Sequence, residues 1–163
     1  MRITGMARQA LAVALLAAGG ALALPGMAAP AGAAEVPPSE VVVADFAVGQ
    51  PLTDAPGDPA AGRKHFADRK LGNCLACHAN TDLSEQLFHG NVGPPIDGVA
   101  ERWEPAQLRA IVVNSKAVFG PETVMPGFYS LDVGADIRKD LAGQTILTAQ
   151  QVEDIVAYLS TLK

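Results

Sequence analysis

The sequence has little cysteine, few aromatic residues and few positive charges. It holds 2 Cys among 163 residues, which excludes a scaffold built on many disulfides. Lys and Arg number 12 against 17 Asp and Glu, and this formal net charge of -5 argues against a nucleic-acid binder, which needs a basic face. The aromatic residues are 5 Phe, 2 Tyr and 1 Trp. A small chain with so few large apolar side chains buries little surface, so we expect an additional element to stabilise its core.

Long apolar runs are confined to the N-terminus. Arg2 and Arg8 stand at the start of the chain, an apolar run covers Leu11–Leu24, and small residues fill 28–34. This order is typical of a secretory signal, so residues 1–34 are predicted to be a signal peptide that is removed. Removal would change the net charge from -5 to -7, because the segment holds two basic residues and no acid. A retained membrane anchor is the alternative, although a spanning helix needs about 20 unbroken apolar residues.

The next segment, residues 35–57, is predicted to be an extended N-terminal arm. Its prolines forbid a long helix, whereas the apolar residues Val41–Val43 and Phe46 argue against a fully solvated linker. We expect the arm to lie against its own domain or against a partner chain. A mobile leader is the alternative.

The remaining residues, 58–163, are expected to form one domain with three helical patterns and no alternating strand pattern. The first helix is predicted over 58–69, where Asp-Pro suits a helix start. The second covers 104–114. The last begins at Thr148, which forms a capping-box pattern with Gln151. Its apolar residues follow the helical spacing: Val152, Ile155, Val156 and Leu159. The predicted fold class is therefore all-α with long loops.

Both cysteines lie in the segment Cys74-Leu75-Ala76-Cys77-His78, which has the C-x-x-C-H pattern of covalent haem attachment. Two thiols at this spacing can each form a thioether with a vinyl group of one haem, and the next residue is then placed beneath the iron. We therefore expect Cys74 and Cys77 to bind one haem c and His78 to be an axial iron ligand. The macrocycle would supply the apolar bulk that the side chains lack.

Three other uses of a C-x-x-C pair are alternatives. A zinc site would need further Cys or His ligands at suitable spacing, and the sequence has no third Cys. A thioredoxin-like redox pair would need a βαβ context, whereas the pattern here is helical. A structural disulfide suits an exported chain but leaves His78 unexplained.

Met125 is the only methionine outside the predicted signal, and it lies in the loop sequence Val124-Met125-Pro126-Gly127. A thioether is a soft ligand that favours reduced iron, whereas a Met in such a loop is poorly placed to fill the core. We therefore expect Met125 to be the second axial ligand. His65 on the first helix and His89 in a loop near the haem edge are the competitors. With both axial positions filled, one-electron transfer is the chemistry that remains.

The loop Gly93-Pro94-Pro95 offers backbone carbonyl groups to the histidine of the motif. Pro94 is the expected acceptor for the second ring N–H of His78, and this hydrogen bond would fix the tautomer of the ring. Pro95 is the alternative acceptor. Trp103 is expected to line the pocket or to donate to a haem propionate, with ordinary core packing as the alternative.

Several of these segments together resemble the class I cytochrome c family. They are Asp58–Gly62 with Phe66, Cys74–His78, Gly93-Pro94, Met125-Pro126 and the closing helix. The resemblance covers about 58–163. It implies that the first and last helices cross around the haem, with Gly62 and Phe66 lying against Tyr158.

Longer stretches resemble the SoxX family, the mono-haem subunits of the periplasmic SoxAX cytochrome of sulfur-oxidising bacteria. They are Gly72–His78, Gly90–Pro95, Thr123–Pro126 and Ile146–Leu159, with the long connection Phe128–Leu147 between the last two. The resemblance implies a periplasmic heterodimer with SoxA. It implies that this complex, an L-cysteine S-thiosulfotransferase, oxidatively couples thiosulfate to a cysteine of the SoxYZ carrier.

In that family the substrate chemistry lies in SoxA, so the resemblance implies no catalytic residue in this chain. It implies that the chain accepts the released electrons and passes them to a small soluble cytochrome c. A free-standing periplasmic cytochrome c shuttle is the alternative function.

Overall fold

The computed structural model describes residues 34–132 and 137–163. The predicted signal peptide therefore lies outside the described residues, apart from Ala34. The helices are α1 (Pro59–Ala67), α2 (Val99–Arg102), α3 (Pro105–Phe119) and α4 (Ala149–Leu159), with single 3-10 turns at η1 (Cys74–Ala76), η2 (Thr81–Leu83) and η3 (Lys139–Leu141). The described ranges contain two isolated β-bridges and no longer strand, and this confirms the all-α class. None of the described helices has the length and apolar character to cross a membrane.

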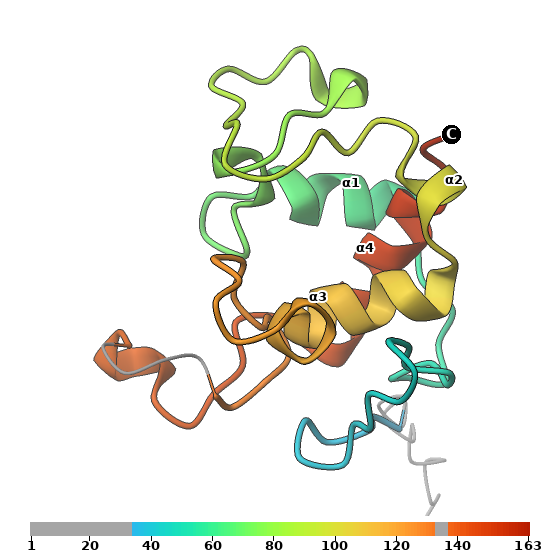
Figure 1. Cartoon of the computed structure of the whole chain (residues 1–163), viewed down its shortest axis with the longest axis vertical. Helices are drawn as coiled ribbons and strands as arrows, with labels where there is room; N and C mark the ends of the chain where they lie inside the picture. Colours follow the sequence, from blue (N-terminus) through green and yellow to red (C-terminus); the bar gives the residue numbers. More distant parts are fainter. Residues whose placement is uncertain (1–33, 133–136) are drawn as a thin grey trace, which may run out of the picture. The chain divides into compact units, whose positions relative to one another are not determined.

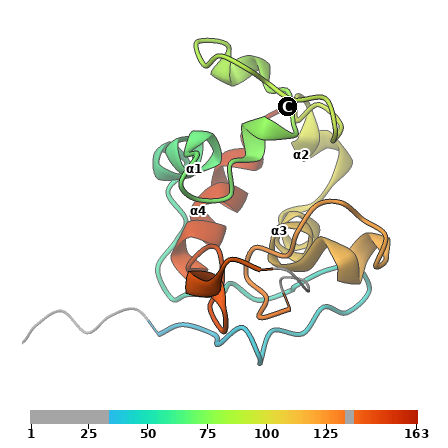
Figure 2. The ribbon, with the colours of Figure 1, turned by 90° about the vertical axis from the view of Figure 1, so that its left-hand side faces the viewer.

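Helices α1 and α4 cross at Gly62, and α3 packs against the other side of α4 (Figures 1 and 2). A Cβ atom on Gly62 would lie 1.9 Å from the carbonyl oxygen of Asp154, so only glycine permits this approach of the two backbones. One turn later the rings of Phe66 and Tyr158 meet edge to face, with centroids 5.9 Å apart. The crossing predicted around these residues is therefore confirmed.

The helix ends follow the predicted caps closely. The side chain of Asp58 accepts a hydrogen bond from the first turn of α1, and Thr148 and Gln151 form the capping box of α4. Helix α1 ends two residues before the predicted position, because Asp68 adopts an extended backbone. The second predicted helix, over 104–114, differs more from the structure. It continues beyond Asn114, where φ is -154° and ψ is 88°, so the predicted end is instead a break inside α3.

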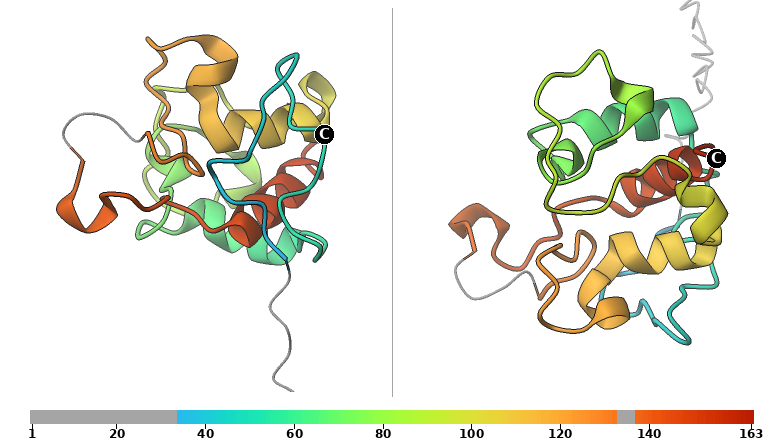
Figure 3. Two further views of the ribbon diagram at one scale, coloured as in Figure 1. Left: turned by 90° about the horizontal axis from the view of Figure 1, so that it is seen from below. Right: turned by 45° about the horizontal axis from the view of Figure 1, so that its top comes forward.

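The N-terminal arm packs on its own domain, across α3 and α4 (Figure 3). The N–H of Val48 donates to the carbonyl of Ala106 (2.9 Å), and the N–H of Leu52 donates to the buried carboxylate of Glu153 (2.9 Å). Arg109, also buried, donates to the Val48 carbonyl (3.0 Å) and to both carboxylate oxygens of Glu153 (2.7 and 2.8 Å). One ion pair between α3 and α4 therefore holds the arm.

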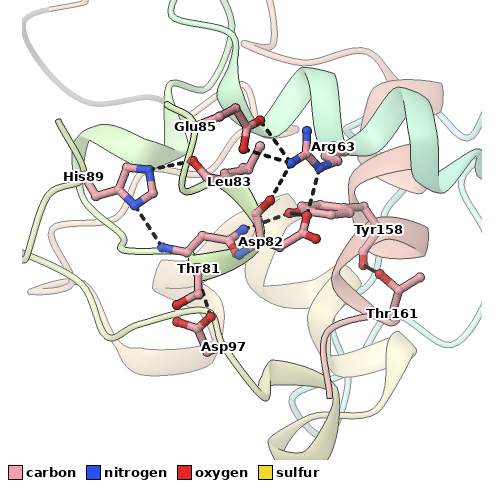
Figure 4. A network of polar contacts seen from close by, with 10 residues as sticks. Arg63, Thr81, Asp82, Leu83, Glu85, His89, Asp97, Tyr158 and Thr161 are labelled. Carbon is pink, nitrogen blue, oxygen red and sulfur yellow. Dashed lines mark hydrogen bonds and ion pairs between the residues drawn. The ribbon is translucent and has the colours of Figure 1, made fainter. Parts of the chain in front are cut away.

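A second polar network ties the loop after the cysteine motif to the helix crossing (Figure 4). The Asp82 carboxylate accepts hydrogen bonds from the Tyr158 hydroxyl (2.7 Å) and from Nε of Arg63 (2.8 Å). Arg63 also pairs with Glu85 (3.0 Å). The hydrogen bonds from Tyr158 and Arg63 lower the pKa of Asp82, and burial together with the bond to Asp82 raises the pKa of Tyr158. The network thus joins α1, η2 and α4.

Candidate haem-binding site

A cavity of about 370 Å³ lies among the four helices, and all five predicted site residues line it. These are Cys74, Cys77, His78, Pro94 and Met125. The rest of the lining is mainly apolar and includes Leu108, Ile111, Val112, Phe128, Ile155 and Leu159. An apolar cleft of this size with a few convergent polar groups is the usual form of a cofactor pocket. The residues present therefore fit a large, flat, apolar group held by two thiols.

The turn η1 brings the cysteine motif to one side of the cavity. The N–H groups of Cys77 and His78 both donate to the carbonyl of Cys74 (3.1 and 3.0 Å), and Asn73 enters the turn with a left-handed φ of 49°. The two cysteines do not form a disulfide with each other. Burial raises the pKa of Cys74 to about 12, which disfavours the thiolate that a thioredoxin-like exchange needs.

The loop Gly93-Pro94-Pro95 orients the ring of His78, as the sequence predicted. Its Nδ1 lies 2.7 Å from the carbonyl oxygen of Pro94, whereas the carbonyl of Pro95 accepts from Arg102 (2.9 Å). With Nδ1–H donating, Nε2 is the nitrogen whose lone pair is available to a metal.

Gly93 is a residue whose contribution the sequence analysis missed. A Cβ atom at this position would lie 2.3 Å from Cε1 of the His78 ring, so a side chain there would displace the ring. The Gly-Pro-Pro run was visible in the sequence, but the need for glycine appears only once the ring has been placed.

Met125 lies on the cavity wall, in the loop that follows α3. The hydroxyl of Ser115, which is fully buried, donates to the Met125 carbonyl (2.6 Å). The ammonium group of Lys116 donates to the carbonyls of Pro121 (3.3 Å) and Thr123 (2.5 Å). No sequence signal singled out Ser115, because a serine just after a predicted helix is ordinarily unremarkable.

The two competing histidines are engaged elsewhere and do not belong to the cavity lining. Nε2 of His65 lies 3.4 Å from the carboxylate of Asp154. Nδ1 of His89 accepts from the N–H of Asn80 (3.3 Å), and its Nε2–H donates to the carbonyl of Leu83 (3.1 Å) (Figure 4). Both ring nitrogens of His89 are thus used to close its own loop.

Exposed apolar side chains surround the opening of the cavity. Val92, Phe119 and Val124 line it and keep exposed fractions of 65%, 51% and 78%. Trp103 also lines the cavity, and its ring packs edge to face against Phe119 with centroids 5.8 Å apart. These apolar side chains therefore lie where the cavity meets solvent.

Comparison with known proteins agrees with this geometry. The family profile described as "Cytochrome c" matches residues 59–163. The chain belongs to the cytochrome c family. Its cofactor is accordingly haem c, which the thiols of Cys74 and Cys77 attach covalently and which supplies a reversible one-electron couple.

Two solved structures resemble this cytochrome. SoxXA from P. pantotrophus is 43% identical over 79% of this chain and 98% of that chain, with a TM-score of 0.73, and this likeness supports the resemblance to SoxX. The c-type cytochrome SorU from Sinorhizobium meliloti is 25% identical over 64% of this chain and 88% of that chain, with a TM-score of 0.42. A search of curated protein sequences found no match.

Proposed function

We propose that this cytochrome is the electron-transfer subunit of a SoxAX complex that oxidises thiosulfate in the periplasm. The observation that supports this most strongly is 43% identity over 98% of a chain of SoxXA. In this function thiosulfate is joined to a cysteine thiol of the SoxYZ carrier, and each sulfur–sulfur bond formed releases two electrons. A haem accepts electrons singly, so this chain takes them one at a time and passes each to a small soluble cytochrome c.

We propose that His78, through Nε2, and Met125, through its thioether sulfur, would bind the haem iron. Both side chains line the same cavity, and the Pro94 carbonyl leaves Nε2 as the free nitrogen of the His78 ring. With both side chains bound, the iron would offer thiosulfate no coordination site on this chain. The assignment therefore restricts the chain to electron transfer and leaves the substrate chemistry to SoxA.

Two exposed surfaces are candidates for the contact with SoxA. One is the arm segment 41–46, in which Val42 and Phe46 are 73% and 60% exposed. The other is the opening of the cavity, with Phe119 and Val124. Large apolar side chains grouped at a surface are typical of sites that another protein covers.

The proposal is tested by purifying the tagged full-length protein from a sulfur-oxidising host that matures c-type cytochromes. We expect a larger haem-containing subunit to co-elute in constant ratio. Thiosulfate should then reduce the haem of this chain only when the carrier is present, with thiosulfate alone as the control.

A free-standing shuttle is the second candidate, because the arm packs on its own domain. Elution as a monomer without a second haem protein would favour the shuttle and contradict the SoxAX proposal. Absence of covalent haem from the matured protein would contradict both.

A further inference from the structure

The break in α3 faces the loop that carries Met125. Asn114 leaves the helical conformation, and its side-chain oxygen accepts a hydrogen bond from the N–H of Lys116 (3.2 Å). Ser115 thus lies at the point where the helix turns, and it is 0% exposed. A serine within a helix can donate to the carbonyl four residues before it, whereas Ser115 donates across to the carbonyl of Met125.

Backbone hydrogen bonds fix the same loop just beyond Met125. The N–H groups of Phe128 and Tyr129 donate to the carbonyls of Val112 and Val113 (both 3.1 Å), which directly precede the break. Before Met125, Lys116 binds the carbonyl of Thr123 (2.5 Å). The loop is therefore attached to the broken helix on both sides of Met125, and Ser115 binds Met125 itself.

We propose that Ser115, assisted by Lys116, is a positioning residue that keeps the thioether of Met125 in the cavity when the haem is oxidised. The inference rests on the proposed ligation of the iron by Met125. A thioether is a soft ligand and binds oxidised iron more weakly than reduced iron. Methionine also has three rotatable side-chain bonds. Retention of the ligand in the oxidised state thus depends on how firmly its backbone is fixed, and Ser115 fixes that backbone.

The test compares variants of the mature, oxidised haem protein by imidazole titration. Imidazole binds the iron only when Met125 is detached, so its apparent affinity reports the detached fraction. We expect Ser115→Ala to bind imidazole about ten-fold more tightly, because the positioning role requires this buried hydrogen bond to be lost when Met125 detaches. The far-red charge-transfer absorption of thioether-ligated oxidised haem should weaken in parallel.

Ser160→Ala is the matched control. It also removes a hydroxyl that donates to a backbone carbonyl, that of Val156 (2.7 Å), but at the C-terminal cap of α4 and not to the Met125 loop. We expect imidazole affinity within two-fold of the unaltered protein. Ser115→Thr keeps a hydroxyl and should restore most of the lost ligation.

Lys116→Gln is the second test, because this side chain is not fully buried and the variant should mature normally. We expect it to change imidazole affinity in the same direction as Ser115→Ala, by a smaller factor. If both variants behave like Ser160→Ala while Met125→Ala binds imidazole more tightly, the positioning role is wrong. If Met125→Ala leaves both the affinity and the far-red absorption unchanged, the ligand assignment under the proposed function is wrong instead.

Discussion

Position 93 determines whether the His78 ring can take its place in the cavity. An added Cβ would lie 2.3 Å from the ring, so Gly93→Ala should push the ring away from the Pro94 carbonyl. We expect unfolding of the haem protein to become easier by about 1–3 kcal/mol, as is usual for overpacking. Urea unfolding followed by haem absorption measures this change.

Gly49→Ala is the control for that variant, because nothing lies within 4 Å of a Cβ at position 49. Its unfolding midpoint should stay close to that of the unaltered protein. Equal midpoints for Gly93→Ala and Gly49→Ala would show that the His78 ring accommodates the methyl group. The short distance between position 93 and the ring would then not affect stability.

At the scale of elements, the carboxylate of Asp82 connects the loop after the cysteine motif to α1 and α4, and its pKa is lowered. The hydrogen bonds from Tyr158 and Arg63 favour ionised Asp82 in the folded state. The pKa of an unfolded Asp is about 3.9, so the stabilisation is fully present above this pH and declines as the pH falls through the lower, folded value.

We therefore expect Asp82→Asn to be less stable than the unaltered protein at pH 6, and the difference to shrink below about pH 4. The side chain of Asp82 is 46% exposed, so solvent screening limits the difference to about 1 kcal/mol. Urea midpoints of the two haem proteins across this range measure it, and titrations common to both proteins cancel. A difference that is independent of pH would contradict the role given to the ionised carboxylate.

The arm depends on another pairing between elements, that of Arg109 and Glu153. Glu153→Leu removes an acceptor from the Leu52 N–H and leaves the buried Arg109 without its carboxylate. We expect unfolding to become easier by about 3–5 kcal/mol, because an unpaired charge remains buried. The double variant Arg109→Met with Glu153→Leu should recover much of this loss. If it is as unstable as the single variant, charge burial is not the cause.

The sequence predicted the elements whose signals are local. The caps at Asp58 and Thr148 and the cysteine motif depend on residues within a few positions of one another. The predicted positions of these features agree with the structure to within two residues. The sequence predicts a helix end at Asn114, where α3 instead breaks and continues. Hydrogen bonds from the side chains of Ser115 and Lys116 to residues 121–126 stabilise the piece beyond the break. Such contacts join distant parts of the chain and leave no periodic pattern.

The same limit applies to the cavity. The motif Cys74–His78 and the loop residue Met125 indicated the cavity in the sequence. Gly93 and Ser115 were not recognised, because each matters only through a neighbour that folding brings close.

For the whole molecule, the arm exposes an aromatic residue in an unfavourable backbone conformation. Phe46 and Asp45 both have positive φ, 61° and 50°, in the turn that pairs Ala44 with Ala47. Such a conformation is uncommon for a bulky residue and is often kept where function requires it. Exposed aromatic anchors of this kind frequently carry much of the binding energy at an interface.

We expect Phe46→Ser to weaken association with the larger subunit about 30-fold, as loss of about 2 kcal/mol at an anchor residue would. The unfolding midpoint of the isolated chain should hardly change. Affinity measured with immobilised subunit tests this, and Phe119→Ser probes the cavity opening in the same assay. If neither variant weakens association, both proposed contact surfaces are wrong.

Glu153 binds both Arg109 of α3 and the arm, and this affects when the arm can fold. The arm's anchor is assembled from α3 and α4 together, so residues 35–57 can settle only after those helices have met. Helices that line a cavity for a covalent cofactor are expected to meet firmly only once it is attached. An immature chain would then present its N-terminal segment to proteases while a finished one conceals it, so susceptibility of that segment to cleavage would report whether maturation is complete.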